Sequence, residues 1–257
     1  SIAMLKIRYT DIEHGERSIK PDSQGFVLTN EEPEPIRYLT EIAKPTNVLA
    51  IVGGGDTMLL GVLPFVREVT GIDVSYRSIA ATAVKVGLID RNYPYIQRVL
   101  DCGEKYFEDF VNKELIEYVP ENVRNKGHSS FREIFDPETR ADWYYPRFER
   151  MWSQTSPEIL ERIRKNLPGL SLVHGDARNV KGRFDMIYAS NTCDDKWTGY
   201  LPFTPYRFLS MIKHRGFLLS SAEIHAAKRL GAREVAKTTS RKEGATPWDY
   251  TLYRRMF

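Results

Sequence analysis

The stretch that decides the fold is NVLAIVGGGDTMLLGVLP, residues 47–64. Its first part, 48–52, is a short aliphatic run that leads into three consecutive glycines at 53–55. Such a run predicts a buried strand that ends in a tight turn. Asp56 or Thr57 is then placed to cap a helix, which we expect to end before the proline that closes the stretch.

The residues that follow continue the pattern. The run REVTGIDVS, 67–75, predicts a second strand that ends near Asp73, and the alanine-rich segment 76–87, closed by a glycine, predicts a second helix. Strand, glycine turn, helix, strand and helix form the opening of a doubly wound α/β domain. In such a domain the ligand lies at the carboxyl ends of the strands.

The remaining strands are predicted after a long interruption. From about 89 to 169 the periodicity is helical, and we expect a helical insertion that covers the cofactor edge of the sheet. Strands then resume as LSLVHGDA, RFDMIYASN, RGFLLSS, REVAKTTS and DYTLYRRM, the last two as a terminal hairpin-like pair. The predicted organisation is an N-terminal segment, 1–46, and an α/β domain, 47–257, with a doubly wound, mostly parallel sheet of seven strands.

Composition limits the classes of protein to consider. The 257 residues are 42% hydrophobic and 28% charged, which is ordinary for a globular chain with a buried core. No apolar run reaches the roughly 18 residues of a membrane span, and the start is too polar for a secretory signal. The two cysteines have no metal-ligand spacing, so we expect a reducing cytoplasm and no metal site. The net charge of +3 is spread in both signs, and no nucleic-acid partner is expected.

The glycine turn and Asp73 together indicate an adenosine-containing cofactor. Glycines permit unusual backbone angles and let a ligand approach the main chain closely. An acid at the end of the second strand, roughly 20 residues on, is placed to hold ribose hydroxyls. A nicotinamide dinucleotide would require a third glycine where Met58 stands, and Asp56 would face its pyrophosphate. S-adenosylmethionine carries a sulfonium and an ammonium but no phosphate, so it fits better. Simple tight packing of the turn remains the alternative.

A third feature is VHGDARNV, residues 173–180. Asp176 follows a predicted strand and is placed to accept a hydrogen bond from the adenine amino group. Gly-Asp is also a common turn, so this feature gains weight only from its order after the first two.

The order of VLAIVGGGD, VTGIDVS, LVHGDARNV and FDMIYASN resembles the class I S-adenosylmethionine-dependent transferases, a family with a Rossmann-like methyltransferase fold. The first motif departs from the common pattern at Ala50, Val52 and Asp56. The form Gly55-Asp56, then a small polar residue and leucines, is more similar to the aminocarboxypropyl-transferase family of betaine-lipid synthesis. That family also has a long helical insertion before the Gly-Asp strand.

The resemblance implies a set of cofactor contacts in which each motif holds one part of S-adenosylmethionine. The glycine loop would surround the methionine portion, the end of the second strand the ribose, the Gly-Asp motif the adenine, and the tip of the next strand the sulfonium. In that order the residues are Gly53, Gly54, Gly55 and Asp56; Asp73 and Val74; Asp176 and Ala177; Ser190 and Asn191.

Candidates for a catalytic base lie in SNTCDDKW, where Asp194 and Asp195 directly follow the strand tip. Adjacent carboxylates can raise one pKa, but the same pair fits a solvated loop that caps a helix. His128 and His174 are isolated in sequence, which is more typical of structural residues. The aromatic segment 142–152 fits an acceptor pocket, and equally fits packing of the insertion on the sheet. The basic, aromatic tail, 240–257, fits contact with an anionic acceptor or a membrane surface, and equally an edge strand with solvated arginines.

These observations predict an enzyme, an S-adenosylmethionine-dependent transferase. The main hypothesis is transfer of the aminocarboxypropyl group to an unidentified acceptor, with release of methylthioadenosine. The alternative is methyl transfer to a small molecule or a lipid. A nicotinamide oxidoreductase and a catalytically silent binding protein remain open as other classes. The sequence names neither the acceptor nor the oligomeric state.

Overall fold

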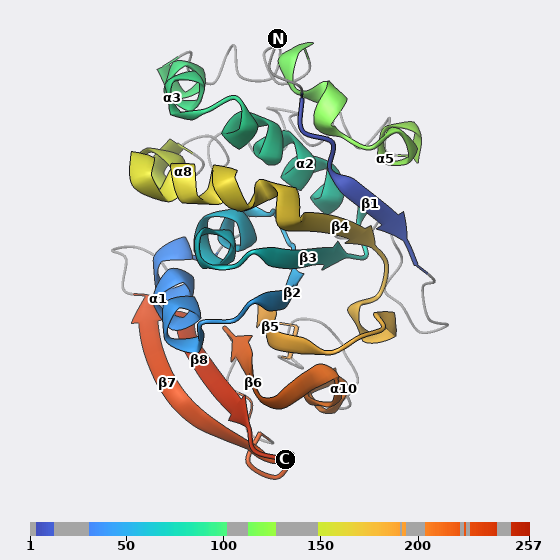
Figure 1. Cartoon of the computed structure of the whole chain (residues 1–257), viewed down its shortest axis with the longest axis vertical. Coiled ribbons are helices and arrows are strands. Elements are labelled where there is room, and N and C mark those ends of the chain that lie inside the picture. Colours follow the sequence, from blue (N-terminus) through green and yellow to red (C-terminus); the bar gives the residue numbers. More distant parts are fainter. Residues whose placement is uncertain are drawn as a thin grey trace.

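The computed structural model describes residues 4–12, 31–101, 113–126, 149–190, 192–193, 204–221, 224, 227–240 and 248–257. A central sheet of eight strands has the order β1-β4-β3-β2-β5-β6-β8-β7. Figure 1 shows β1, β4, β3, β2 and β5 one below the other, with β6 beneath them and β8 and β7 to its left. The strands are β1 Arg8–Asp11, β2 Asn47–Ile51, β3 Glu68–Asp73, β4 Leu170–His174, β5 Phe184–Ser190, β6 Ile212–Ser220, β7 Ala232–Ser240 and β8 Trp248–Arg255.

The pairing of the strands confirms the predicted doubly wound, mostly parallel sheet. Strands β1 to β6 pair in parallel, and β8 lies antiparallel between β6 and β7. From β2 the chain builds outward through β3 to β4 and then returns to add β5 and β6 on the other side of β2. The order therefore reverses between β2 and β5, which makes the carboxyl ends of these two strands the topological switch point.

The eighth strand, β1, was not predicted. It is a four-residue segment, RYTD, that pairs with β4, from Arg8↔Ser171 to Asp11↔His174. Its residues are mostly exposed, because it lies at the edge of the sheet, so it lacks the alternating apolar pattern of a half-buried strand.

Helices cover both faces of the sheet. They are α1 Pro33–Ala43, α2 Tyr76–Asp90, α3 Tyr93–Asp101, α5 Glu121–Lys126, α8 Pro157–Asn166 and α10 Thr204–Met211. Side chains alternate along β2, so Val48 and Ala50 pack into one apolar cluster with α1, α2 and α8, whereas Leu49 packs into a second cluster with Phe208 of α10. Figure 1 accordingly shows α8 and α1 on the left and α10 at the lower right.

The insertion between α2 and β4 is helical wherever the structure describes it. It contains α3, α5, α8 and the short turns η3 Ile116–Tyr118 and η4 Leu167–Gly169. His128 and most of the aromatic segment, including Trp143, Tyr144 and Tyr145, lie outside the described residues. Trp152, at the end of that segment, is 1% exposed and belongs to the apolar core.

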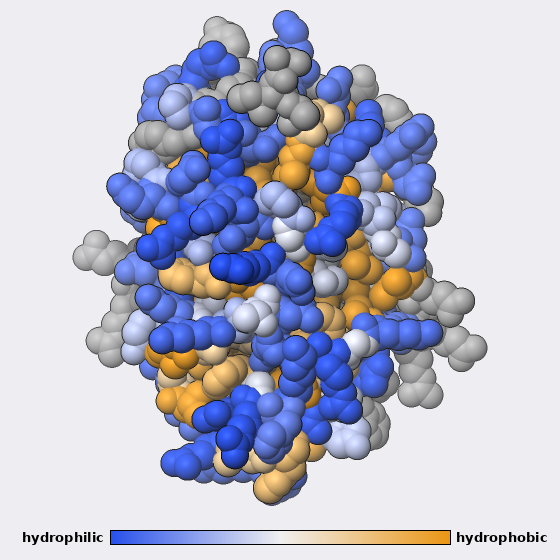
Figure 2. Space-filling model, in the orientation of Figure 1, coloured by the Kyte–Doolittle hydropathy of each residue, from blue (hydrophilic) through white to orange (hydrophobic). Residues whose placement is uncertain are grey.

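The surface is mixed in character. Hydrophilic residues cover most of the face shown in Figure 2, with apolar residues in smaller groups between them. Within the described ranges, none of the helices combines the length and the hydrophobicity that crossing a membrane requires.

Candidate functional site

The glycine loop lies at the switch point, between β2 and a short π-helical turn, η1 Met58–Val62. Gly53 and Gly55 have φ angles of 52° and 86°, in the left-handed region that favours glycine. A Cβ on Gly55 would lie 2.4 Å from Oγ1 of Thr82 in α2, whereas a Cβ on Gly53 would meet nothing within 4 Å. Gly55 therefore lets the loop pack on α2, and Gly53 leaves open the side of the loop that a ligand can approach.

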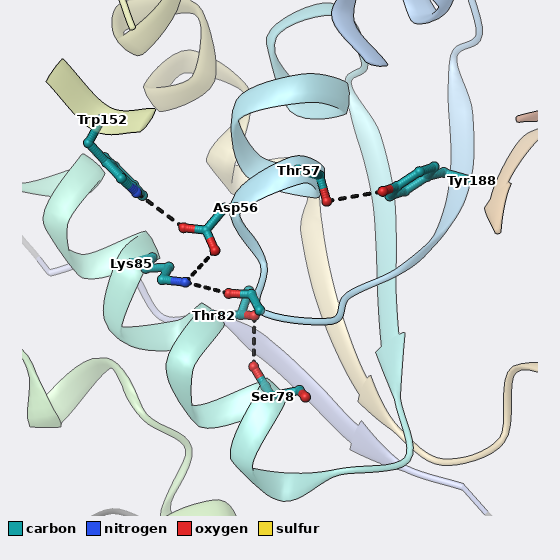
Figure 3. Close-up of polar contacts among 8 residues, drawn as sticks. Asp56, Thr57, Ser78, Thr82, Lys85, Trp152 and Tyr188 are labelled. Atoms are coloured by element: carbon teal, nitrogen blue, oxygen red, sulfur yellow. Dashed lines mark hydrogen bonds and ion pairs between the residues drawn. The ribbon is translucent and has the colours of Figure 1, made fainter. Parts of the chain in front are cut away.

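The carboxylate of Asp56, the residue after the three glycines, is buried against α2 and the insertion. Its side chain is 0% exposed and accepts from Lys85 Nζ at 2.6 Å and from Trp152 Nε1 at 3.2 Å (Figure 3). Lys85 also donates to the Gly54 carbonyl at 2.6 Å. Burial lowers the pKa of the Lys85 ammonium, and the nearby Asp56 opposes that shift. The buried ion pair thus ties the loop to α2 and to the insertion.

Thr57 does not cap the helix expected after the loop. It occupies the N-cap position of η1 without a side-chain hydrogen bond to the turn, and its hydroxyl lies 3.1 Å from the hydroxyl of Tyr188 in β5. Asp56 bonds to Lys85 of α2 and to Trp152 of the insertion. Both side chains bridge to other elements, and the segment forms a π turn followed by the 3₁₀ turn η2 Leu63–Phe65 in place of an α-helix.

Asp73, at the end of β3, is joined directly to the glycine loop. Its Oδ2 accepts from the Gly53 N–H at 3.0 Å, and its Oδ1 accepts from the Ser75 N–H at 2.9 Å. Loss of solvent raises the pKa of the Asp73 carboxyl to about 7, against the opposing effect of these backbone donors. The structure therefore brings together two of the residues that the sequence assigned to the cofactor.

The region after β4 contains Asp176 and Ala177, the residues expected near the adenine. Asp176 is 2% exposed and accepts from the Arg178 guanidinium, with contacts of 2.5–3.1 Å, and from the Arg178 backbone N–H at 2.8 Å. It caps the turn η5 Ala177–Asn179. The carboxylate is thus oriented by its neighbour in sequence, and its contact with adenine stays a prediction.

His174 has partners that the sequence did not reveal. Its Nδ1 lies 3.0 Å from Asp11 Oδ1, its Nε2 lies 3.0 Å from the Val74 carbonyl oxygen, and its ring stacks on Tyr76 at 3.5 Å. The ring thus contacts two oxygens on opposite sides, one from β1 and one from the residue that follows β3. The interaction fastens β1 to the end of β3, at Val74.

A cluster around Glu31 was missed at the level of sequence. Glu31 is 1% exposed, and its Oε1 accepts from Ser190 Oγ at 2.9 Å. The same carboxylate accepts from the hydroxyls of Tyr188 and Ser221. Glu31 stands in a polar segment, NEEPEP, with no periodic pattern, and its partners are about 160 to 190 positions away. Only the order of the strands could have shown that these residues meet.

The tip of β5 is only partly described. Ser190 has a φ of 53°, which is unusual for a residue other than glycine. Asn191, Asp194 and Asp195 lie outside the described residues, so the two candidate bases remain sequence-based predictions. Among the described residues, no group of three or more histidine, cysteine, aspartate or glutamate side chains is arranged to hold a metal ion.

Comparison with known sequences finds no matching family model and no matching curated protein. Among solved structures, the N-methyltransferase NodS from Bradyrhizobium japonicum WM9 is similar, with 11% identity, a TM-score of 0.44, and 86% of this chain and 93% of that chain covered. An rRNA methylase from Streptococcus thermophilus has 9% identity and a TM-score of 0.38, with 90% and 100% covered. A tRNA m1G37 methyltransferase from M. jannaschii has 9% identity and a TM-score of 0.35, with 85% and 46% covered.

These comparisons correct one expectation. We expected no nucleic-acid partner, but the similar structures include an rRNA methylase and a tRNA methyltransferase. The exclusion of nucleic acid is therefore wrong, because neither the mild net charge nor the fold provides grounds for it. The fold class itself is the expected one: a doubly wound, mostly parallel α/β sheet with a glycine loop at its switch point.

Proposed function

We propose that this chain is an S-adenosylmethionine-dependent transferase and that it transfers the methyl group. The observation that carries the proposal is the hydrogen bond between the Gly53 N–H and Asp73 Oδ2 at the switch point. It joins an open glycine loop to an acid at the tip of the neighbouring strand, the arrangement that suits a ribose beside a close backbone approach. Space beside Gly53 supports the fit of the cofactor, because a side chain there would fill it.

The charge of the site favours a cationic ligand. The carboxylate of Asp73 lies at the end of β3 and that of Glu31 lies beside β5, whereas Asp56 is already paired with Lys85. A dinucleotide would bring a pyrophosphate to this acidic edge, which is electrostatically unfavourable. The methionine portion of S-adenosylmethionine brings an ammonium, and its sulfonium supplies an activated carbon for displacement.

The contributions of the chain to the reaction would be alignment and exclusion of water. Asp73 would accept hydrogen bonds from the ribose hydroxyls, and Gly53 would let the backbone approach the cofactor. Ser190, at the tip of β5, would contact the methionine portion of the cofactor. A nucleophile on the acceptor forms the new bond to the methyl carbon as the carbon–sulfur bond breaks, sulfur keeps the electron pair, and the acceptor loses a proton. We propose Asp194 or Asp195 as the group that receives this proton.

Aminocarboxypropyl transfer is the second candidate. It is favoured by the motif GGGDTMLL, which departs from the common methyltransferase pattern at Asp56 and resembles the betaine-lipid family. The same atoms would then bind the same cofactor, but the acceptor would attack a different carbon next to sulfur. The two candidates therefore differ in their products and not in their cofactor.

The test has two parts. Calorimetric titration of the purified chain with S-adenosylmethionine measures binding, and the Asp73→Ala variant should lose at least about tenfold in affinity, as expected for one charge-assisted hydrogen bond. Incubation with separate RNA, lipid and small-molecule fractions of a cell extract then identifies the acceptor class. Acceptor-dependent S-adenosylhomocysteine supports methyl transfer, and methylthioadenosine supports the second candidate. Absence of binding to the wild-type chain would overturn the proposal.

A further inference from the structure

The hydroxyl cluster around Glu31 stands at the centre of the proposed site. Thr57 lies two residues after the last glycine of the loop, Tyr188 and Ser190 are in β5, and Ser221 directly follows β6. Their hydroxyls are linked through the carboxylate of Glu31 or, for Thr57, through Tyr188. Glu31 lies just before α1. The backbone N–H of the next residue, Glu32, donates to the hydroxyl of Tyr250 in β8 at 2.9 Å. The segment is therefore anchored where three parallel strands end.

The directions of the hydrogen bonds follow from the chemistry of the partners. An ionised carboxylate only accepts, so Tyr188, Ser190 and Ser221 each direct their single hydroxyl proton to Glu31. Burial, together with the negative charge of Glu31, raises the pKa of the Tyr188 hydroxyl, which keeps its proton in place. Thr57 then donates to the Tyr188 oxygen. The lone pairs of the serine oxygens are left as hydrogen-bond acceptors, with a buried negative charge behind them.

Ser190 is the member that a ligand can reach. It is partly exposed, whereas Glu31 and Ser221 are buried. Its φ of 53° is strained for serine, and its carbonyl is held by the Ser221 N–H at 3.0 Å and by Ser220 Oγ at 3.1 Å. A backbone outlier that the surroundings hold in place often marks a functional site. Here it aims the serine oxygen while the hydroxyl proton points back to Glu31.

We propose that Glu31, acting through Ser190, forms the subsite for the α-ammonium group of the cofactor's methionine portion. The proposal rests on the proposed function. An ammonium carries N–H donors and a positive charge, which match an acceptor oxygen with a carboxylate behind it. The sulfonium carries the same charge but no N–H donor, so it would gain the charge interaction alone. Ser190 makes the direct contact, and Glu31 is a positioning residue that also supplies the charge.

The experiment compares three ligands that retain different parts of the cofactor. S-adenosylmethionine has the ammonium, the carboxylate and the sulfonium; S-adenosylhomocysteine has the ammonium and the carboxylate but no sulfonium; and methylthioadenosine has none of the three. Titration calorimetry measures each affinity for the wild-type chain, Glu31→Gln and Ser190→Ala. Glu41→Gln, on an exposed acid of α1, is the matched control for the lost charge. The melting temperature of every variant is recorded without ligand.

The expected result is a parallel loss. Glu31→Gln should lower the affinities for S-adenosylmethionine and S-adenosylhomocysteine by a similar factor, about tenfold or more. The affinity for methylthioadenosine should stay within about twofold of the wild-type value. Ser190→Ala should lower the affinities for the same two ligands. Because it keeps the buried carboxylate, it tests the subsite even if Glu31→Gln is too unstable to titrate. Glu41→Gln should leave all three affinities unchanged.

Other patterns would overturn the proposal. Loss of S-adenosylmethionine binding alone would place the charge against the sulfonium, and equal loss of all three ligands would mean that Glu31 only supports the fold. Unchanged affinities would remove Glu31 and Ser190 from the site. Failure of the wild-type chain to bind any of the three would instead overturn the proposed function, and with it this subsite.

Discussion

Asp56 has two possible roles, contact with a ligand and a structural ion pair with Lys85. Its position in the loop favours a ligand contact, but the carboxylate is 0% exposed and pairs with Lys85 at 2.6 Å. We expect Asp56→Asn to destabilise the chain by about 3–5 kcal/mol, because it leaves the Lys85 charge buried without its counter-charge. Urea unfolding of the two single variants and of Asp56→Asn/Lys85→Met measures this. If the double variant loses nearly the sum of the two single losses in unfolding free energy, Asp56 and Lys85 are not energetically coupled, and the prediction is wrong. A loss below about 1 kcal/mol for Asp56→Asn alone would also contradict it.

Asp73 predicts a pH dependence of cofactor binding. Burial raises the pKa of this carboxyl to about 7, so below that pH the group is mostly protonated and accepts hydrogen bonds poorly. Ribose hydroxyls are donors to an ionised carboxylate. Affinity for S-adenosylmethionine should therefore rise as the pH increases from 6 to 8, by calorimetric titration at constant ionic strength. Asp73→Asn should bind more weakly and show no such rise, and an identical slope in that variant would assign the effect to another group.

The same carboxyl should be visible in the stability of the ligand-free chain. The folded state keeps the Asp73 proton up to a pH of about 7, whereas the unfolded state releases it near its ordinary pKa of 3.8. Its contribution to the free energy of unfolding is full below the lower pKa and is lost as the pH rises to the higher one. The difference in unfolding free energy between wild type and Asp73→Asn should therefore change across pH 4–7 and stay constant above it. A flat difference would mean that Asp73 has an ordinary pKa.

The sequence predicted that two residues share a site where each lies at the end of one of two adjacent parallel strands. Gly53 and Asp73 were assigned to one site from sequence, and they share a hydrogen bond because adjacent parallel strands end at the same edge. Glu31 and Asp11 were not predicted, since Glu31 meets Tyr188 and Asp11 meets His174 more than 150 positions along the chain. No local pattern records such a pairing.

At the scale of elements, two glycines of the loop have different roles: Gly55 packs against α2, and Gly53 leaves space that a ligand can enter. Gly53→Ala should cost about 1–2 kcal/mol for its left-handed backbone, and its methyl group would enter the open side of the loop. It should fold but bind S-adenosylmethionine more weakly. Gly55→Ala should destabilise the chain more, because its methyl group meets Thr82 at 2.4 Å. Melting temperature and titration of both variants check the contrast, and normal cofactor affinity in Gly53→Ala would show that no ligand lies against this loop.

Strands were predicted correctly from the sequence where their burial requires a run of apolar residues. The strands β2 to β6 were predicted from apolar runs, and the hairpin of β7 and β8 was predicted too, although β7 is mostly exposed. The four-residue edge strand β1 was missed, and the α-helix expected after the loop is a π turn followed by a 3₁₀ turn. There, Asp56 bonds to Lys85, and Thr57 contacts Tyr188 and makes no cap hydrogen bond. Tertiary contacts decided these two elements, and local propensity did not.

At the scale of the whole molecule, the two ends of the sheet have different characters. The proposed site lies at the carboxyl ends of β2, β3 and β5, where carboxylates and hydroxyls gather. A groove at the opposite, amino ends is lined by four basic residues together with Glu68 and Asn47; the basic residues are Arg8, Arg67, Lys181 and Arg183. A parallel sheet places ligands at its carboxyl ends, so the groove should not contribute to cofactor binding.

The double variant Arg67→Ser/Arg183→Ser tests this polarity. A ligand at 100 times its dissociation constant stabilises the folded state by about 2.7 kcal/mol, which is visible as a rise in melting temperature. S-adenosylhomocysteine should produce the same rise in the double variant as in the wild-type chain, whereas Gly53→Ala, at the other end of the sheet, should reduce it. If the double variant loses the rise and Gly53→Ala retains it, the ligand lies at the amino ends, and the assignment of the site to the switch point is wrong.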